Sequence, residues 1–303
     1  TPAKCLVKPG DHVLRGQLIG EKNGFISVPV HASASGTVKA VDSFQGPAGG
    51  FAPGVVLETD AVQQDAPRFP ALDWQTADAA ALLARVGEAG ICGMGGAGFP
   101  TAVKLCPPKG SKCEFLVVNG AECEPYLTAD YRLMLEKAAR VRLGVEIMRK
   151  ILGGPAVRIA IEANKPDAIA AMEKAFADIE GDVEIVVLPC LYPQGSEKHQ
   201  IYATTKRIVP EGALPIAVGC VVENVGTVAA IADAVELGLP LISRITTVSG
   251  DAVAHPCNVH APVGTRYADL VAFAGGEQGK VAKVLSGGPM MGFALPSLEA
   301  PMT

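Results

Sequence analysis

Residues 114–126 read Glu-Phe-Leu-Val-Val-Asn-Gly-Ala-Glu-Cys-Glu-Pro-Tyr, an apolar run that ends in a polar cluster. A short apolar run between polar residues is typical of a buried strand, so we expect a strand over residues 114–119. The polar residues start where that strand ends, and open α/β sheets bind ligands at the carboxyl ends of their strands. The stretch therefore predicts an α/β fold with a binding site, provided that further strands run parallel to this one.

Strand and helix patterns do alternate on either side of this stretch. Asp130 precedes a helix with apolar residues at helical spacing, and Thr76 is placed to cap an alanine-rich helix that runs through Ala89. The sequence also predicts strands over residues 157–161, 183–188 and 216–222, and helices over residues 166–176, 196–206 and 225–237. This alternation predicts a mostly parallel sheet with helices on both faces, in a domain that spans residues 63–240.

Residues 1–62 carry short apolar runs between turn residues, which predicts a small all-β module. The pattern Gly-Asp-x-Val-x-x-Gly-Gln-x-Ile-Gly from Gly10, followed by Val-Pro-Val-His-Ala-x-x-Ser-Gly-Thr-Val from Val28, resembles the barrel-sandwich fold of lipoyl and biotinyl domains. A carrier domain needs a modifiable lysine on an exposed hairpin, and Lys22 is the nearest candidate. The Met-Lys-Met of biotinyl domains is absent, which favours an unmodified structural module.

Residues 241–287 return to short strands and turns around one helix at residues 267–273. Strands are expected over residues 245–249 and 281–285. One helix among short strands fits a β-grasp-like module, and residues 288–303 follow it as a tail.

Composition restricts the class of protein. The chain has 303 residues, 49% of them hydrophobic and 19% charged, which predicts an ordinary globular core, and its net charge of −5 argues against a nucleic-acid partner. The longest apolar run, residues 213–222, is broken by Pro215 and Gly219, so we expect no transmembrane segment in this chain. The absence of an initiator Met and of a signal-peptide pattern suggests a chain that begins within a longer protein.

The cysteines predict neither disulfides nor metal clusters. None of the eight is spaced as C-x-x-C, so the sequence encodes no iron–sulfur cluster or zinc ribbon, and we expect reduced thiols. His255, Cys257 and His260 lie close together, but no fourth ligand is near and the context is a proline-rich turn. We therefore expect no metal site.

A glycine-rich block carries the strongest local signal. Residues 93–104 read Gly-Met-Gly-Gly-Ala-Gly-Phe-Pro-Thr-Ala-Val-Lys. Glycines let a ligand approach the backbone closely, a helix that starts near Pro100 adds its positive end, and Lys104 adds a full charge. The block is neither a Walker loop nor a normal dinucleotide fingerprint. A phosphate site is favoured over a tight structural turn.

Polar clusters follow three of the expected strands. Asn119, Glu122 and Glu124 follow the first, residues 192–198 (Tyr-Pro-Gln-Gly-Ser-Glu-Lys) follow the second, and residues 223–227 (Glu-Asn-Val-Gly-Thr) follow the third. Each cluster alone could be a solvated turn. Because all three follow strands of one sheet, a pocket that unites them with the glycine-rich block is favoured over four unrelated turns.

These four blocks, in this order, are similar to the FMN- and NADH-binding blocks of the flavin subunit of respiratory complex I. Because a lipoyl-like module stands before them and a β-grasp module of the SLBB type follows, the chain is identified as a member of the RnfC family. This family comprises the C subunits of the bacterial Rnf (or Rsx) ion-translocating electron transport complex. The resemblance implies a Rossmann-like FMN domain between the two small modules, and it covers essentially the whole chain.

The resemblance also implies roles for individual residues. The residues implied to cradle the FMN phosphate and ribityl chain are Gly93, Gly95, Gly96 and Lys104. Those implied to hold the flavin are Asn119, Tyr192, Gly195, Asn224 and Thr227. Those implied to face NADH are Phe99, Glu122, Glu124 and Glu197. No catalytic acid or base is implied, because hydride transfer is the chemistry of the cofactor. Two departures from complex I stand out: Ala121 replaces an Asp, and Ser196-Glu197 replaces paired glutamates.

The function implied by the resemblance is an FMN-dependent NADH oxidoreductase module that passes electrons to iron–sulfur carriers, with ferredoxin exchange coupled to Na⁺ or H⁺ movement. The implied partners are the other members of an Rnf-type complex, ferredoxin or iron–sulfur carriers, and NADH, at the cytoplasmic face of the inner membrane. Family members continue into a ferredoxin-like segment, so [4Fe–4S] clusters are expected only beyond Thr303. The alternatives are a flavin-free docking or scaffold protein and a lipoyl-type carrier modified on Lys22.

Overall fold

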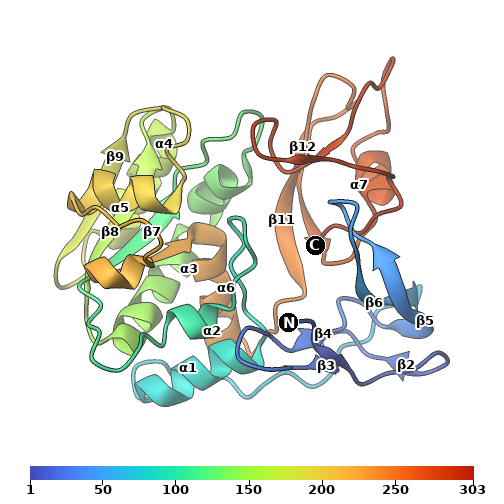
Figure 1. The fold of residues 1–303 in the computed structure, drawn as a ribbon, viewed down its shortest axis with the longest axis horizontal. Coiled ribbons are helices and arrows are strands. Elements are labelled where there is room, and N and C mark those ends of the chain that lie inside the picture. Colours follow the sequence, from blue (N-terminus) through green and yellow to red (C-terminus); the bar gives the residue numbers. More distant parts are fainter. The chain divides into compact units, whose positions relative to one another are not determined.

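A four-stranded parallel sheet organises the central part of the chain in the computed structural model, which describes residues 1–303 (Figure 1). The strand order is β10, β7, β8, β9, and every neighbouring pair is parallel. The strands are β7 (Phe115–Gly120), β8 (Ala156–Glu162), β9 (Val183–Leu188) and β10 (Cys220–Asn224). The structure confirms the parallel sheet expected from the alternating pattern.

Helices cover the sheet. The helical elements of this part are α1 (Ala79–Glu88), α2 (Thr101–Lys104), α3 (Ala129–Leu152, with a non-helical residue at Lys137), α4 (Pro166–Phe176), α5 (Glu197–Thr205), the 3₁₀ turn η1 (Pro215–Val218) and α6 (Val225–Glu236). Cys220 and Val222 of β10 pack in one apolar cluster with Ile201 of α5. Because side chains alternate along a strand, Val221 and Glu223 point to the opposite face.

The structure corrects two details of the expected pattern. Residues 216–222 do not form one strand: Pro215 begins the η1 turn, Gly219 ends it with a left-handed φ of +70°, and the strand starts only at Cys220. The N-cap of α1 is Asp78, whose carboxylate accepts the N–H of Ala81 at 2.7 Å, and not Thr76. The first difference has a local cause, since proline lacks the N–H that a strand ladder needs. The second does not, because threonine and aspartate can both cap a helix.

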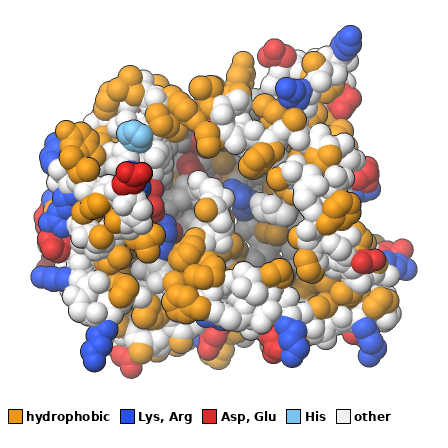
Figure 2. Space-filling model, viewed as in Figure 1, with side chains coloured by type: hydrophobic (Ala, Val, Ile, Leu, Met, Phe, Trp, Pro, Cys, Tyr) orange, Lys and Arg blue, Asp and Glu red, His pale blue; other side chains and the backbone are white.

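The chain divides into two compact units. One contains Phe69–Cys123 and Asp130–Pro240, and therefore the parallel sheet. The other contains Thr1–Arg68, Glu124–Ala129 and Leu241–Thr303. None of the helices combines the length and the apolar character needed to cross a bilayer. On the face drawn in Figure 2, side chains of both charge signs are interspersed with apolar ones.

The N-terminal module consists of two small antiparallel sheets, ordered β1-β3-β4 and β2-β5-β6. Its strands are β1 (Lys4–Cys5), β2 (His12–Val13), β3 (Leu18–Glu21), β4 (Val30–His31), β5 (Gly36–Gln45) and β6 (Phe51–Thr59). Val13, Ile19, Ala32 and Val38 form its small apolar core. The all-β architecture agrees with the expected barrel-sandwich module, and Lys22 is an exposed residue directly after β3.

The C-terminal module pairs β11 (Ser243–Val248) with β12 (Cys257–Pro262) and packs α7 (Tyr267–Phe273) against them. Its core includes Val248, Leu270 and Met302. The strand expected over residues 281–285 is reduced to β13 (Leu285–Ser286), which pairs with β14 (Phe293–Ala294). One helix on short strands agrees with the expected β-grasp-like architecture.

Candidate functional site

The glycine-rich block forms a loop between α1 and α2 that is fixed at both ends. The N–H of Gly93 donates to the carbonyl of Phe99 at 2.9 Å, which closes the loop. The N–H of Met94 donates to Oγ1 of Thr227, in the first turn of α6, at 3.0 Å. Thr227 is fully buried, so the loop is attached to a rigid element of the sheet domain.

The rest of this loop presents unpaired donors to open space. Residues 95–98 are exposed, and their backbone N–H groups make no hydrogen bond within the protein. Gly96 and Gly98 have φ values of +156° and +61°, and a Cβ added to either would meet no atom within 4 Å. Glycine is required at these angles, and unpaired N–H groups on such a turn are suited to an anion.

Asn224 holds the start of α6 beside this loop. Its Oδ1 accepts the N–H of Gly226 at 2.8 Å as an N-cap, and its Nδ2 donates to the carboxylate of Asp130 at 2.6 Å. A Cβ on Gly95 would lie only 3.0 Å from Cβ of Asn224, so the loop packs directly on this cap. The glycine-rich block and the block at residues 223–227 therefore pack against each other, as expected if the two blocks form one site.

Lys104, the last residue of α2, reaches the end of β10. Its Nζ donates to the carbonyl of Val222 at 2.7 Å and to Oε1 of Glu197, at the start of α5, at 3.1 Å. Oε1 of Glu223 lies 3.9 Å away. One ammonium group therefore faces two carboxylates, and three segments far apart in the sequence meet at it.

Glu223 is the charged residue that sequence reasoning missed. It stands within a quoted block, but no role was assigned to it. Its side chain is 2% exposed, and burial raises the pKa of its carboxyl to about 7. The nearby charge of Lys104 lowers this pKa, and that of Glu197 raises it further. A glutamate inside the apolar strand Cys220-Val-Val-Glu was the available signal.

Asn119 joins the first two strand-end clusters. Its Nδ2 donates to the carbonyl of Gly195 at 2.9 Å, while its Oδ1 accepts from the N–H of Ala121 at 3.1 Å and from Nε2 of Gln200 at 2.6 Å. A Cβ on Gly195 would lie 2.5 Å from the carbonyl oxygen of Ala121. Asn119 and Gly195 therefore interlock two loops at the carboxyl edge of the sheet.

Glu122 is occupied within the protein. Its carboxylate accepts the N–H groups of Asp130 and Tyr131 at 3.0 and 3.1 Å, which satisfies donors at the start of α3. Its backbone carbonyl accepts from Nζ of Lys165 at 3.4 Å, and Lys165 itself forms a buried ion pair with Glu162 at 2.8 Å. These contacts fix the loop after β7.

The other three residues expected at the site, Glu124, Tyr192 and Phe99, each lie in a different environment. Glu124 belongs to the unit that holds the two small modules, where its carboxylate accepts the N–H groups of Met290 and Met291 at 2.9 and 2.8 Å. Tyr192 is 41% exposed in the loop after β9. Phe99 is half-buried and closes the glycine-rich loop through its backbone.

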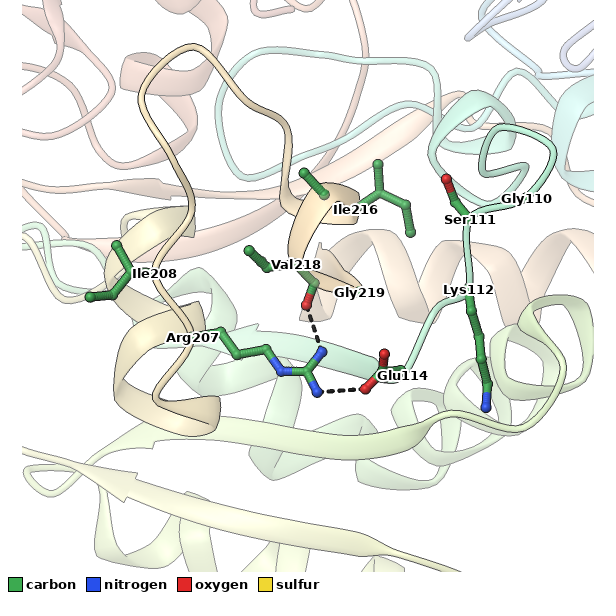
Figure 3. Close-up of a pocket in the computed structure, with 10 residues that line it drawn as sticks. Gly110, Ser111, Lys112, Glu114, Arg207, Ile208, Ile216, Val218 and Gly219 are labelled. Atoms are coloured by element: carbon green, nitrogen blue, oxygen red, sulfur yellow. Dashed lines mark hydrogen bonds and ion pairs between the residues drawn. The ribbon is translucent and has the colours of Figure 1, made fainter.

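The amino-terminal edge of the same sheet carries a separate depression of about 660 Å³, shown in Figure 3. Glu114 and Gly219, which precede β7 and β10, line it. Arg207 donates to the carbonyl of Val218 at 2.6 Å and to Glu114 at 2.5 Å, so the charge of this cation is matched within the protein. The depression lies at the strand ends opposite to those that carry the loops described above.

Three domain families match the chain. The Nuo51 FMN-binding domain matches residues 86–233, the RnfC Barrel sandwich hybrid domain matches residues 1–62, and the SLBB domain matches residues 245–294. The glycine-rich loop, α5 and the start of α6 all lie within the first match. The central α/β domain thus matches an FMN-binding domain family, and it is flanked by matches to a barrel-sandwich and an SLBB domain.

Two curated relatives match nearly the whole chain. The C subunit of the proton-translocating ferredoxin:NAD⁺ oxidoreductase complex of Clostridium ljungdahlii is 46% identical over 99% of this chain and 66% of its own length. The C subunit of the ion-translocating oxidoreductase complex of Pseudomonas aeruginosa is 47% identical over 99% of this chain and 39% of its own length. The chain spans less than two thirds of either relative.

Among solved structures, the NAD⁺-reducing [NiFe]-hydrogenase matches in two states. The air-oxidized state gives a TM-score of 0.59 and the H₂-reduced state a TM-score of 0.60, both at 25% identity over 74% of this chain and 46% of that chain. The fold of about three quarters of this chain therefore recurs in an NAD⁺-reducing enzyme. From the two relatives and the three domain matches in this order, we conclude that the chain belongs to the RnfC family.

Proposed function

We propose that the chain is the FMN-dependent NADH oxidoreductase module of a membrane-associated electron transport complex. The observation that carries the proposal is the glycine-rich loop, whose four consecutive unpaired N–H groups at residues 95–98 lie next to the capped start of α6. Backbone donors and a helix N-terminus together form a recurrent site for phosphate. The match of residues 86–233 to an FMN-binding domain supports the same cofactor.

The residues present fit FMN. Gly96 and Gly98 leave open space where any side chain would project, which is the room that a bound phosphate and ribityl chain need. Lys104 supplies a cation that is 30% exposed, and Glu197 beside it is 40% exposed. Gly93 and Thr227 act indirectly in this proposal, since they hold the loop in place. Asn224 and Gly195 likewise shape the site, and Asn119 holds the loop of Gly195.

In this proposal FMN supplies the hydride-accepting and electron-passing chemistry when bound. The protein then has to position the cofactor, screen its charge and insulate it from solvent, and it needs no acid or base of its own. In this proposal the glycine-rich loop donates hydrogen bonds, Lys104 provides positive charge, and Glu197, which is paired with Lys104 and 40% exposed, is accessible to a nucleotide substrate. Tyr192 and Phe99 offer partly exposed aromatic surface for stacking.

The setting of the module is proposed from the relatives. A relative named for a ferredoxin:NAD⁺ oxidoreductase complex suggests NADH and ferredoxin as electron partners, and a name that includes ion translocation suggests coupling to H⁺ or Na⁺ movement. The other members of such a complex are then direct partners at the cytoplasmic face of the membrane. We further propose the domain limits 1–62, 63–240, 241–287 and 288–303, with [4Fe–4S] clusters carried outside this chain.

The proposal is tested first by cofactor binding. Titration of the purified chain with FMN, followed by quenching of flavin fluorescence, should give saturable binding of one FMN per chain. Riboflavin, which lacks the phosphate, should bind more weakly because the unpaired N–H groups of the loop remain unused. Equal affinity for both would remove the phosphate from the glycine-rich loop, and no binding of either would favour a docking or scaffold protein.

Lys104→Ala should weaken FMN binding by about 1.5–3 kcal/mol, or roughly tenfold or more, because a hydrogen bond to a charged group is lost. Lys104 is the only cation in the glycine-rich block. Equilibrium dialysis measures the change, and Lys112→Ala, at the opposite edge of the sheet, is the matched control. Unchanged FMN affinity in the Lys104 variant would place its ammonium group outside the site.

Glu197→Gln should leave FMN bound while it changes NADH affinity and the preference for NADH over NADPH. The variant keeps the shape of the side chain and removes a charge that lies 3.1 Å from Lys104. A carboxylate near the nucleotide repels a 2′-phosphate, so the variant should accept NADPH better. Stopped-flow flavin bleaching with each nucleotide tests this, and identical kinetics in variant and wild type would contradict it.

A further inference from the structure

Glu223 is a buried carboxyl that the proposed FMN site does not explain. It is 2% exposed at the end of β10, and its Oε1 is buried without a hydrogen-bond partner. Buried carboxylates are normally satisfied by hydrogen bonds or else carry a proton. A group in this situation changes its protonation when the charge beside it changes.

The charges that face Glu223 come from two elements. Nζ of Lys104, in α2, lies 3.9 Å from Oε1 of Glu223. Oε1 of Glu197, in α5, lies 3.1 Å from the same Nζ. In β7 the residue in register is Val118, and residues 225–232 of α6 include no titratable side chain. Lys104 is therefore the one positive charge beside Glu223, and it is shared with a second carboxylate.

We infer that Glu223 takes up a proton from solvent when negative charge of FMN lies beside Lys104, so that the charge of the bound cofactor and protonation of the protein are coupled. The inference rests on the proposed function. In this step one O–H bond forms on the Glu223 carboxyl, the proton comes from water or buffer, Lys104 stays an ammonium ion, and no electron moves.

The direction follows from electrostatics. Lys104 favours the ionised form of Glu223, while burial and Glu197 favour the neutral form. An anion beside Lys104 offsets the positive charge of Lys104, so the neutral form of Glu223 becomes more favoured. Since the pKa of Glu223 is about 7 before that change, the carboxyl is partly ionised near neutral pH and able to take up a proton.

The anionic group could be the phosphate, present on binding, or the flavin ring, which gains negative charge on reduction. Both act on Lys104 by the same electrostatics, and they differ in when the proton is taken up. Uptake on binding of FMN but not of riboflavin assigns it to the phosphate. Uptake on reduction, seen as a pH dependence of the flavin potential that Glu223→Gln weakens, assigns it to the ring.

The experiment is calorimetry of FMN binding to the whole chain near pH 7.5, in buffers that differ in ionisation enthalpy. The variant Glu223→Gln keeps the side-chain shape and cannot titrate. Glu180→Gln makes the same change on an exposed residue and is the matched control. If the phosphate is the source, wild type and the Glu180 variant should take up a large fraction of one proton per FMN more than the Glu223 variant; if the ring is the source, this difference should appear only in the pH dependence of the flavin potential.

Infrared difference spectroscopy of the wild type gives a readout that needs no variant. A protonated carboxyl band should appear when FMN binds or, in the second case, when the bound flavin is reduced. If FMN binds but this band is absent at both steps, or if proton uptake and potential are the same in wild type and Glu223→Gln, the inference is overturned and the proposed function stands. If FMN does not bind, both are overturned.

Discussion

Gly144→Ala is expected to destabilise the sheet domain by about 3 kcal/mol, at the upper end of what one added methyl group costs in a packed core. A Cβ at this position of α3 would lie 2.0 Å from the backbone carbonyl oxygen of Val228 in α6 and 2.8 Å from its carbonyl carbon. Backbone cannot yield as a side-chain tip does, so α3 and α6 must move apart. The start of α6 holds Asn224 and Thr227, and FMN binding should weaken as well.

Gly87→Ala is the matched control for this prediction. It makes the same change within α1, where the new Cβ would lie 3.6 Å from Cβ of Ala102, an ordinary contact. Alanine is favoured over glycine in a helix by about 1 kcal/mol, so this variant should be as stable as wild type or more stable. Urea unfolding measures both, and a loss below about 1 kcal/mol in Gly144→Ala would contradict the close helix contact.

Glu223→Gln should raise the unfolding free energy of the flavin-free protein relative to wild type, and this gain should be about 3 kcal/mol larger at neutral and alkaline pH than in acid. The reason is that the variant has no buried carboxyl group that must ionise as the pH rises. The pKa of Glu223 is raised in the folded protein from 4.5 to about 7. Between these values the folded state holds more protons than the unfolded state, so wild-type stability falls as pH rises. Below pH 4.5 both states are protonated and this contribution is absent.

The measurement is the difference in unfolding free energy between variant and wild type, from urea titrations at several pH values between 4 and 8. The difference should grow in favour of the variant across the window from about 4.5 to 7 and level off above it. Glu180→Gln, on an exposed residue, should give a difference that is flat within about 0.5 kcal/mol. A flat curve for Glu223→Gln would show that this carboxyl titrates normally.

The elements that sequence reasoning predicted best are those whose signals are local. Pro166–Phe176 has proline at its start and regular apolar spacing, and its helix is found at those bounds. The strand expected over residues 216–222 was placed too early, because residues 216–218 follow Pro215 in a 3₁₀ turn and the strand runs from Cys220 to Asn224. The cap of α1 was misplaced by two residues, since Thr76 and Asp78 are both plausible caps and only the fold chooses between them.

The candidate site shows the same limit. The sequence indicated that four blocks converge, and the structure confirms contacts between them, such as Met94 with Thr227 and Asn119 with Gly195. It did not indicate which side chains remain available to a ligand, because that depends on partners far away in the chain. The role of Glu223 was missed for this reason: its neighbour Lys104 is brought to it by the packing of α2 on the end of β10.

The central claim is that this chain binds FMN and lets NADH reduce it. Anaerobic titration of the FMN-reconstituted chain with NADH, followed by flavin absorbance, tests this most directly. The account predicts that the blue absorbance of bound oxidised flavin bleaches in proportion to added NADH, and that the same titration of free FMN at equal concentration bleaches far more slowly. Bound flavin whose absorbance does not change with excess NADH would contradict the account.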